Sequence, residues 1–441
     1  MSRRRAPSAR ALAVLTLRDI DRRDGFSNRI LSDRLERSPT LSLRDRGLVT
    51  TLVYGTLRHR ARLDWHIDAA ARHPKKIKGT LRETLRVAAF ELIELERPLR
   101  VAASEACNTA ASLQQGGNLR GLITALLAEI ERSAAERELD LSAGDDLVAN
   151  IHARWSIPRW LATRWSDELG PQVALERARV LSQPPSIDLR VDTHRISPED
   201  AFIALQAEIP DARIEAVDGF PGTLRVRGGG DLFFGPLHEE GLISVQGLGS
   251  QQAAKLLAPR PGQHVLDACA GHGGKTSQIA EIMERRGEIT MVEPNEQRME
   301  AQSGTIARCR LRDDSLSIIR HHCTLADMPP PTRPFDAILV DAPCTGLGDL
   351  ARHPELRWSR RAADLPRNVE LQRSLLRAAT EHLARHGALV WSVCSLEPEE
   401  GIGIVRDEAD ALGLFVEDTT TLTPEGHGCD GFFAARLRRR E

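Results

Sequence analysis

The stretch VLDACAGHGGKTSQIAEI, residues 265–282, decides the fold class of this 441-residue chain. A short apolar run ends at Asp267, a loop of small residues follows, and a helical pattern begins near Ser277. Small residues at a strand-to-helix turn let backbone N–H groups approach a ligand closely, as in nucleoside-binding α/β folds. A lone loop of this kind is equally compatible with a tight connection that binds nothing.

The end of this loop, Gly-Lys-Thr at residues 274–276, also suggests the phosphate-binding loop of an ATPase. That loop requires a glycine five positions before Gly274, where this chain has Cys269, so the pattern is incomplete. The next apolar run ends at Glu293, and a carboxylate in that position can accept both ribose hydroxyls of a nucleoside cofactor. A nucleoside site is therefore favoured over a triphosphate site.

Short apolar runs alternate with helical patterns through the C-terminal half, which predicts a parallel sheet wound with helices on both faces. The expected strands are residues 264–266, 288–292, 317–319, 335–340 and 388–393. Ligands of such sheets bind beyond the carboxyl ends of the strands. We therefore expect Asp267, Glu293, Asp341 and Cys394 to lie at one edge.

Two further motifs carry thiols at the ends of buried strands: DAPCTGLG at residues 341–348 and CSLEPEE at residues 394–400. A single free cysteine is most often a small buried residue with no chemical role. Two cysteines at the ends of separate strands, beside an acid and a cofactor loop, are harder to explain in this way, so Cys344 and Cys394 are candidate functional residues.

The N-terminal third reads as helical, because apolar residues recur at spacings of three and four from residue 9 to residue 132. Gly116 and Gly117 interrupt this pattern, Ser42 is a plausible N-cap, and the polar residues 133–146 read as a linker. Residues 1–60 contain 14 Arg against 6 Asp plus Glu, which gives 14 − 6 = +8 in a chain of net charge −2. This excess is typical of polyanion binding, although a general preference for Arg would also produce it.

Between these regions, a strand at 186–191, a helix at 197–207 and strands at 223–226 and 232–234 predict a small α+β module. The chain is thus predicted to be multidomain, with an all-α bundle at 1–138, a linker and small α+β RNA-binding module at 139–240, and an α/β catalytic domain at 241–441.

The seven cysteines are odd in number and lack CxxC spacing, so neither a disulfide framework nor a zinc site is expected. The apolar run at 11–17 resembles a signal peptide, but Arg18 and Asp19 end it at the lower limit of such a region, and no cleavage site or membrane-spanning stretch follows. We therefore expect a cytoplasmic protein.

The blocks at 267–276, 341–348 and 394–400 together resemble the RNA cytosine C5-methyltransferases, whose catalytic domain is a Rossmann-like class I methyltransferase. RHPELRW at 352–358 and DGFF at 430–433 are also similar to this family. The helical bundle resembles the NusB type of RNA-binding antitermination factor at SLRDR, residues 42–46, and VYGTLR, residues 53–58. The combination resembles the members that act on 16S ribosomal RNA, over nearly the whole chain.

The resemblance implies transfer of a methyl group from S-adenosylmethionine, without a metal, to carbon 5 of a specific cytosine. It assigns addition at carbon 6 to Cys394, an interaction at ring N3 to Asp341, and product release to Cys344. The residues implied to contact the cofactor are Cys269, Ala270, Gly271, His272, Gly273, Gly274, Lys275, Glu293 and Asp341.

The implied partner is 16S ribosomal RNA, unassembled or partly assembled, and neither a membrane nor an obligate protein partner is implied. Two alternatives stay open. One is a cytosine in transfer RNA as the target, and the other is a non-catalytic RNA-binding assembly factor that has lost the methyl-transfer activity.

Overall fold

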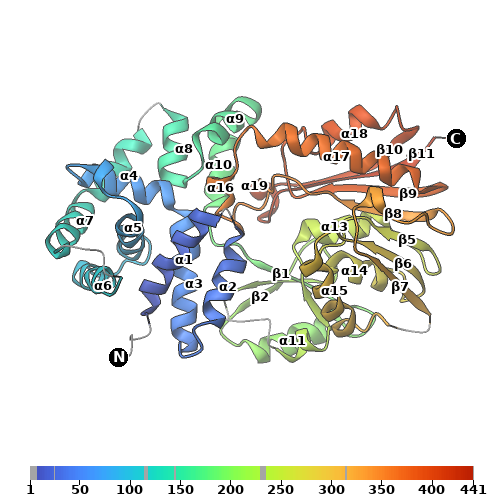
Figure 1. Ribbon diagram of the computed structural model, residues 1–441, viewed down its shortest axis with the longest axis horizontal. Helices are drawn as coiled ribbons and strands as arrows, with labels where there is room; N and C mark the ends of the chain where they lie inside the picture. Colours follow the sequence, from blue (N-terminus) through green and yellow to red (C-terminus); the bar gives the residue numbers. More distant parts are fainter. Residues whose placement is uncertain are drawn as a thin grey trace. The chain divides into compact units, whose positions relative to one another are not determined.

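The structure, a computed structural model, describes residues 7–23, 25–113, 118–143, 146–228, 235–312 and 315–440. The chain divides into two compact units (Figure 1). The first comprises Met1–Pro184 and Leu350–Ala362, and the second comprises Pro185–Asp349 and Ala363–Glu441. The predicted break at Gly116 and Gly117 lies outside the described residues.

The described residues of the first unit are helical or connect helices. The helices are α1 (Ala9–Arg23), α2 (Ser27–Glu36), α3 (Leu43–Arg58), α4 (Arg60–Ala70), the 3-10 turn η1 (Pro74–Lys76), α5 (Gly79–Ile93), α6 (Leu99–Ser112), α7 (Arg120–Ala143), α8 (Leu147–Trp155), α9 (Arg159–Leu169), α10 (Pro171–Leu181) and α16 (Leu356–Ser359).

Helix α5 forms the centre of this bundle and contacts α1, α3, α4, α6 and α7. Its side chains are buried all around the helix from Glu83 to Leu92, as expected for a helix enclosed by others. Gly55 of α3 allows the closest approach, since a Cβ there would lie 2.0 Å from the Phe90 ring. The predicted N-cap is confirmed, because the Ser42 hydroxyl accepts from the backbone N–H of Asp45 at 3.1 Å.

The prediction of a linker at residues 133–146 is wrong for most of this range, because α7 continues without a break to Ala143. Its polar composition is that of a half-solvated helix rather than of a loop. Glu138 fixes this part of α7 against α4. Its carboxylate accepts a hydrogen bond from Arg62 at 2.7 Å and contacts His66 at 3.1 Å, and both of these residues lie on α4.

Residues 350–362 fold within this unit although they follow the DAPC motif of the second. The buried Arg357 guanidinium donates to the carbonyl oxygens of Arg58 (3.0 Å), Trp155 (3.1 Å) and Leu181 (2.6 Å). These are the last residues of α3, α8 and α10, where helix carbonyls lack intrahelical partners and carry partial negative charge. One arginine therefore joins three helix C-termini.

The second unit begins with a four-stranded antiparallel sheet of order β2-β3-β1-β4. Its elements are β1 (Ile187–Val191), α11 (Pro198–Glu208), β2 (Arg213–Ala216), β3 (Thr223–Arg227), α12 (Pro236–Glu239) and β4 (Ile243–Val245). The expected strands at 186–191 and 223–226 and the helix at 197–207 are confirmed within a residue or two. The strand expected at 232–234 lies outside the described residues.

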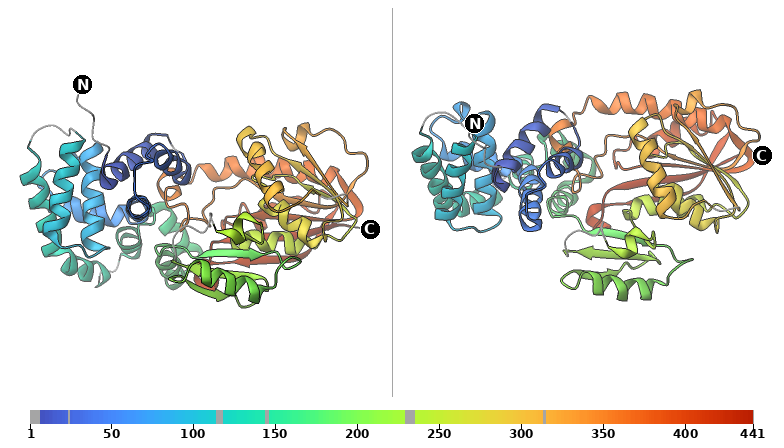
Figure 2. Two further views of the ribbon diagram at one scale, coloured as in Figure 1. Left: turned by 90° about the horizontal axis from the view of Figure 1, so that it is seen from below. Right: turned by 60° about the horizontal axis from the view of Figure 1, so that its bottom comes forward.

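A seven-stranded sheet of order β10-β11-β9-β8-β5-β6-β7 forms the rest of the unit (Figures 1 and 2). Its elements are α13 (Leu248–Leu257), β5 (His264–Asp267), α14 (Gly274–Ile282), β6 (Gly287–Val292), α15 (Glu296–Arg308), β7 (Leu316–His321), the 3-10 turn η3 (Leu325–Asp327), β8 (Phe335–Asp341), α17 (Asp364–Glu381), β9 (Leu383–Val393), α18 (Ile402–Glu408), β10 (Leu414–Leu422), α19 (Pro424–His427) and β11 (Phe432–Arg439). Strands β5 to β9 are parallel, and all five expected strands are confirmed. The antiparallel strands β10 and β11 were not predicted.

The side chains of the central strands alternate between two cores, one on each face of the sheet. Leu266, Ile338 and Trp391 pack with α17 and α18 on one face. Their neighbours Val265 and Val390 pack with α13, α14 and α15 on the other. This two-sided burial explains the uninterrupted apolar runs in the sequence and confirms the predicted Rossmann-like architecture.

The four-stranded sheet is joined to α14 by a buried arginine. Arg190 of β1 donates to Glu281 at 2.7 Å, to Ser277 at 2.8 Å and to the carbonyl of Gly274 at 3.2 Å.

The domain limits expected from the sequence stay a prediction, since they concern parts that would fold independently. Among the described helices, none is both long enough and apolar enough to cross a membrane.

Candidate active site

The carboxyl ends of four parallel strands bring the predicted site residues to one edge of the sheet. Asp267 ends β5 and Asp341 ends β8, which pairs with both β5 and β9. Cys394 directly follows β9, and Glu293 directly follows β6. Neighbouring parallel strands end side by side, so residues far apart in sequence become neighbours here.

The glycine-rich loop after β5 is held in a conformation that favours glycine, with φ of 54° at Gly271 and 85° at Gly273. The Gly271 N–H donates to the Glu293 carboxylate at 3.0 Å. Two side chains of α15 hold the loop from the other side: Gln302 donates to the Gly271 carbonyl at 2.9 Å, and Thr305 donates to the His272 carbonyl at 2.8 Å. Neither residue can be predicted from the sequence, because a polar residue on a helix carries no sign of its distant partner.

This edge has the features that a nucleoside cofactor requires. A Cβ built on Gly271 or Gly274 would meet nothing within 4 Å, so open space borders the loop. The Glu293 carboxylate is 4% exposed and accepts backbone N–H groups of Gly271 and Asn295, one on each oxygen. Each carboxylate oxygen retains a further lone pair for a ribose hydroxyl.

Lys275 and Asp341 form an ion pair of 2.5 Å between Nζ and Oδ2. The Ser392 hydroxyl donates to the other oxygen of Asp341 at 3.0 Å, which fixes the carboxylate. Burial disfavours the Lys275 ammonium, but the charge of Asp341 and its hydrogen bond outweigh burial and raise the pKa of this lysine. Lys275 therefore remains a cation at the centre of the site.

Three segments meet at Cys394 through backbone contacts. The N–H of Gly348, from the loop after β8, donates to the Cys394 carbonyl at 3.0 Å, and the N–H of Gly431 donates to the Gly348 carbonyl at 2.9 Å. A Cβ on Gly348 would lie 2.1 Å from the Gly431 oxygen. This close approach gives a physical reason for the glycines of the DAPCTGLG and DGFF motifs.

Cys344 lies in a loop that a second set of buried polar groups holds on both sides. The fully buried carboxylate of Glu400 accepts from the Thr345 N–H at 2.8 Å and from the Thr345 hydroxyl at 2.5 Å. Gln372 of α17, also fully buried, donates to the Pro343 carbonyl at 3.0 Å and to Glu400 at 3.3 Å. The residues before and after Cys344 are thus fixed by one Glu–Gln pair.

The comparisons with known proteins agree with this geometry. Residues 254–438 match the family described as 16S rRNA methyltransferase RsmB/F, and residues 7–132 match the NusB family. The chain is 32% identical to the probable ribosomal RNA small subunit methyltransferase B of Synechocystis, over 98% of this chain and 99% of that protein. The chain belongs to the RsmB/F family of 16S rRNA methyltransferases. The resemblance stated from the sequence, with its NusB-like N-terminal part, is confirmed.

Other relatives of the RsmB/F family agree. The ribosomal RNA small subunit methyltransferase B of Escherichia coli O6:K15:H31 is 30% identical over 91% of this chain and 92% of that protein. A solved structure titled "Crystal Structure of PH0851" has a TM-score of 0.79 and 21% identity over 99% of both chains, which supports the fold.

Burial raises the pKa of the Cys344 and Cys394 thiols well above the ordinary value of a cysteine. For Cys394 the next contributions are the charges of Asp349 and Asp341, which raise the pKa further, while Lys275 lowers it. For Cys344 the next contribution is the charge of Glu400, which also raises the pKa. Both groups are therefore protonated thiols at neutral pH, and Lys275 acts in favour of the Cys394 thiolate.

Asp267 ends β5, and Cys269 lies in the loop between β5 and α14. Burial raises the pKa of Asp267 to about 6, although the Thr276 hydroxyl donates to its carboxylate at 2.6 Å. Burial also raises the pKa of Cys269, so its thiol stays protonated. In the described part of the chain, no group of three or more His, Cys, Asp or Glu residues could hold a metal ion.

Proposed function

We propose that this chain transfers a methyl group from S-adenosylmethionine to carbon 5 of a cytosine in 16S ribosomal RNA, through a covalent bond between Cys394 and carbon 6 of the base. The observation that carries the proposal is the meeting of two thiols with the Lys275–Asp341 pair, beside a loop that fits a nucleoside cofactor. Membership of the RsmB/F family supports ribosomal RNA as the substrate.

The chemistry explains why a thiol is needed. Carbon 5 of cytosine is a weak nucleophile, and addition of the Cys394 thiolate to carbon 6 moves the C5–C6 electron pair so that carbon 5 can attack. A hydrogen bond or proton at ring N3 favours the addition, and this proposal assigns the interaction at N3 to Asp341. S-adenosylmethionine supplies an electrophilic methyl group when it is bound.

Release of the product requires a base. Cys344, as thiolate, takes the proton from carbon 5, the C5–C6 double bond forms again, and the bond between carbon 6 and Cys394 breaks with its electron pair returning to sulfur. Two thiols then have opposite duties within one cycle. The Thr345–Glu400 contacts hold Cys344 in its loop for this step.

In this proposal the cofactor is bound by the glycine-rich loop and by two acids at neighbouring strand ends. Glu293 accepts hydrogen bonds from the ribose hydroxyls. The residues assigned to the cofactor are Cys269, Ala270, Gly271, His272, Gly273, Gly274, Lys275, Glu293 and Asp341. The charges of Lys275 and Asp341 act on Cys269 of the loop and on Cys394, so these two residues would serve both cofactor and base. A ribosomal RNA target also implies action in the cytoplasm.

Bisulfite sequencing of ribosomal and transfer RNA from a deletion strain tests the proposal. One cytosine of 16S RNA should be protected in the parent, unprotected in the deletion strain, and protected again after complementation with the wild-type gene but not with Cys394→Ala. Loss of protection in a transfer RNA instead would establish the alternative target. Unchanged protection everywhere, with no cofactor binding by calorimetry, would favour the non-catalytic assembly factor.

A further inference from the structure

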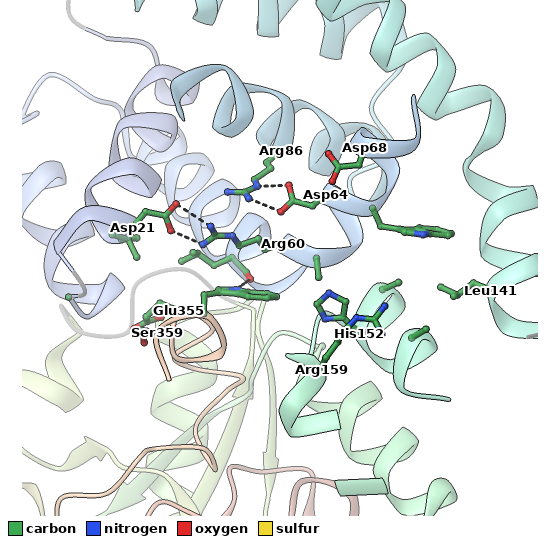
Figure 3. Close-up of a pocket in the computed structure, with 18 residues that line it drawn as sticks. Asp21, Arg60, Asp64, Asp68, Arg86, Leu141, His152, Arg159, Glu355 and Ser359 are labelled. Atoms are coloured by element: carbon green, nitrogen blue, oxygen red, sulfur yellow. Dashed lines mark hydrogen bonds and ion pairs between the residues drawn. The ribbon is translucent and has the colours of Figure 1, made fainter. Parts of the chain in front are cut away.

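The first unit contains a cavity of 720 Å³ that the proposed methyl transfer does not use (Figure 3). It lies among α1, α4, α8 and α16, and its wall includes Trp358 of the RHPELRW motif. Protein interiors are close-packed, and hollows of this size are in the range of ligand sites. The walls therefore indicate what the cavity receives.

Two tryptophans supply flat surfaces. The Trp358 indole N–H donates to the Leu57 carbonyl at 2.9 Å, and the Arg60 guanidinium lies 5.5 Å from the centre of its ring. The Arg137 guanidinium lies 4.4 Å from the ring of Trp65. Indoles held in this way present a surface on which a planar ring can stack.

The charged groups of the wall largely neutralise one another. Arg60 binds Asp21 through two hydrogen bonds of 2.6 and 3.2 Å. Arg86 binds Asp64 through two of 2.6 and 2.8 Å (Figure 3). A cationic ligand would find these carboxylates already paired, and an anion would find the guanidinium groups occupied. An uncharged planar group suits this interior best.

Hydrogen-bond acceptors remain free in the cavity. Arg82 donates to one oxygen of Asp68 at 2.6 Å, and the other oxygen has no hydrogen-bond partner in the described part of the chain. His152 Nδ1 contacts the Ile157 carbonyl at 2.8 Å and therefore carries the hydrogen, which makes Nε2 an acceptor. Burial lowers the pKa of His152, which keeps the ring neutral.

Arg159 differs from Arg60 and Arg86, because no carboxylate of the described residues pairs with it. Arg159 is exposed, lies beside His152 across the cavity from the Arg86–Asp64 pair, and forms no hydrogen bond or ion pair with a described residue (Figure 3). An unpaired guanidinium can bind a phosphate of the RNA backbone. Such a contact would position the base that is attached to this phosphate.

We propose that the cavity receives an unpaired base with an exocyclic amino group, adenine or cytosine, from a single-stranded segment of the RNA substrate. The base stacks on an indole of the wall, its amino group donates to Asp68 and His152, and its phosphate lies at Arg159. Uracil presents a carbonyl where adenine and cytosine present the amino group, and this carbonyl cannot donate to the two acceptors. The inference rests on the proposed RNA substrate but not on methylation of carbon 5.

The test measures binding of labelled single-stranded oligo-A, oligo-C and oligo-U to the full chain by fluorescence anisotropy. Oligo-A and oligo-C should bind about tenfold more tightly than oligo-U. Asp68→Asn keeps the shape and still accepts from Arg82, but it offers an amide N–H to a uracil carbonyl. It should remove most of this preference without unfolding the chain.

Arg159→Ala should weaken binding of all three oligonucleotides by a similar factor and reduce the slope of affinity against salt by about one. Arg179→Ala is the matched control, because Arg179 is an exposed arginine of the same unit that is paired with Glu176 at 2.6 Å and does not line the cavity. It should leave both the affinities for the three oligonucleotides and the salt slope nearly unchanged.

Equal affinities for the three RNAs in the wild type, unaltered by Asp68→Asn, would overturn the inference. Saturable binding of AMP that depends on Asp68, without any preference among the RNAs, would assign the cavity to a free nucleotide and overturn the RNA source. A chain that binds none of the RNAs would also contradict the proposed function, whereas RNA binding without base preference contradicts this inference alone.

Discussion

Lys275 is the residue on which the reactivity of the site depends most directly. Burial and the charges of Asp349 and Asp341 raise the pKa of Cys394, and the charge of Lys275 lowers it. The 2.5 Å contact with Asp341 keeps the ammonium beside the reacting groups. The resemblance assigned this lysine to the cofactor, whereas its neighbours add a role in forming the thiolate.

Adduct formation should therefore rise with pH. Because the pKa of Cys394 lies well above its ordinary value, the thiolate fraction increases about tenfold per unit from neutral to mildly alkaline pH. Lys275→Ala should raise this pKa further and slow single-turnover adduct formation roughly tenfold at a given pH, while Lys275→Arg restores much of the rate. A pH-independent rate in the wild type would remove thiol ionisation from the slow step.

Among the elements, the loop between β8 and residue 350 determines how the two thiols are presented. Glu400 and Gln372 hold the residues on each side of Cys344, and Gly348 binds the Cys394 carbonyl. The partners come from α17 and from the segment that follows β9. Parts of the chain separated by dozens of residues thus set the geometry of one short loop.

Glu400→Ala should impair release more than addition. It leaves the buried Thr345 N–H and hydroxyl without their acceptor, so Cys344 loses its position while Cys394 is retained, and stability falls by about 1–3 kcal/mol. The protein–RNA adduct should then accumulate on denaturing gels, and Glu400→Gln should restore turnover in part.

Glu408→Ala is the control, since this buried glutamate binds Arg373 and Arg377 instead of the loop. It should reduce stability without changing the ratio of adduct to product. Equal losses of addition and release in Glu400→Ala would mean that Glu400 supports the domain in general rather than Cys344.

The strands and their chemically active ends could be predicted because local signals are strong there. Cys344 and Cys394 follow apolar runs that are buried on both faces, and Gly271 occupies a backbone conformation that few other residues adopt. The roles of Glu400 and Gln302 could not be predicted, because their partners lie far along the chain. Polar residues 133–143 were mistaken for a linker, since composition does not reveal the contact of Glu138 with α4.

For the molecule as a whole, the chain path is informative. The catalytic loop belongs to the second unit, but the residues that follow it, Leu350–Ala362, fold in the first and return to the second at α17. Arg357 anchors this segment. Its guanidinium donates to five backbone carbonyls, one of which is that of Leu350 in the same segment. The RHPELRW motif thus has a structural reason that is separate from catalysis.

Arg357→Met should therefore destabilise the protein strongly. Methionine fills part of the volume but leaves the C-terminal carbonyls of three helices without a donor, at a cost of about 3 kcal/mol or more. Thermal unfolding measures the change, with Arg179→Met as a control that should have little effect on the exposed face of α10. A small loss for Arg357→Met would mean that water replaces the guanidinium.

The most direct test of the central claim separates the two thiols on a denaturing gel with substrate RNA and S-adenosylmethionine. The Pro343–Cys344 pair resembles the placement of the nucleophile in DNA cytosine methyltransferases, so the opposite assignment is a real competitor. If Cys394 adds to carbon 6, Cys344→Ala accumulates a shifted protein–RNA species, and Cys394→Ala binds RNA but never shifts. A shifted Cys394→Ala with an unshifted Cys344→Ala would transfer the nucleophile to Cys344, and two unshifted, fully active variants would contradict covalent catalysis altogether.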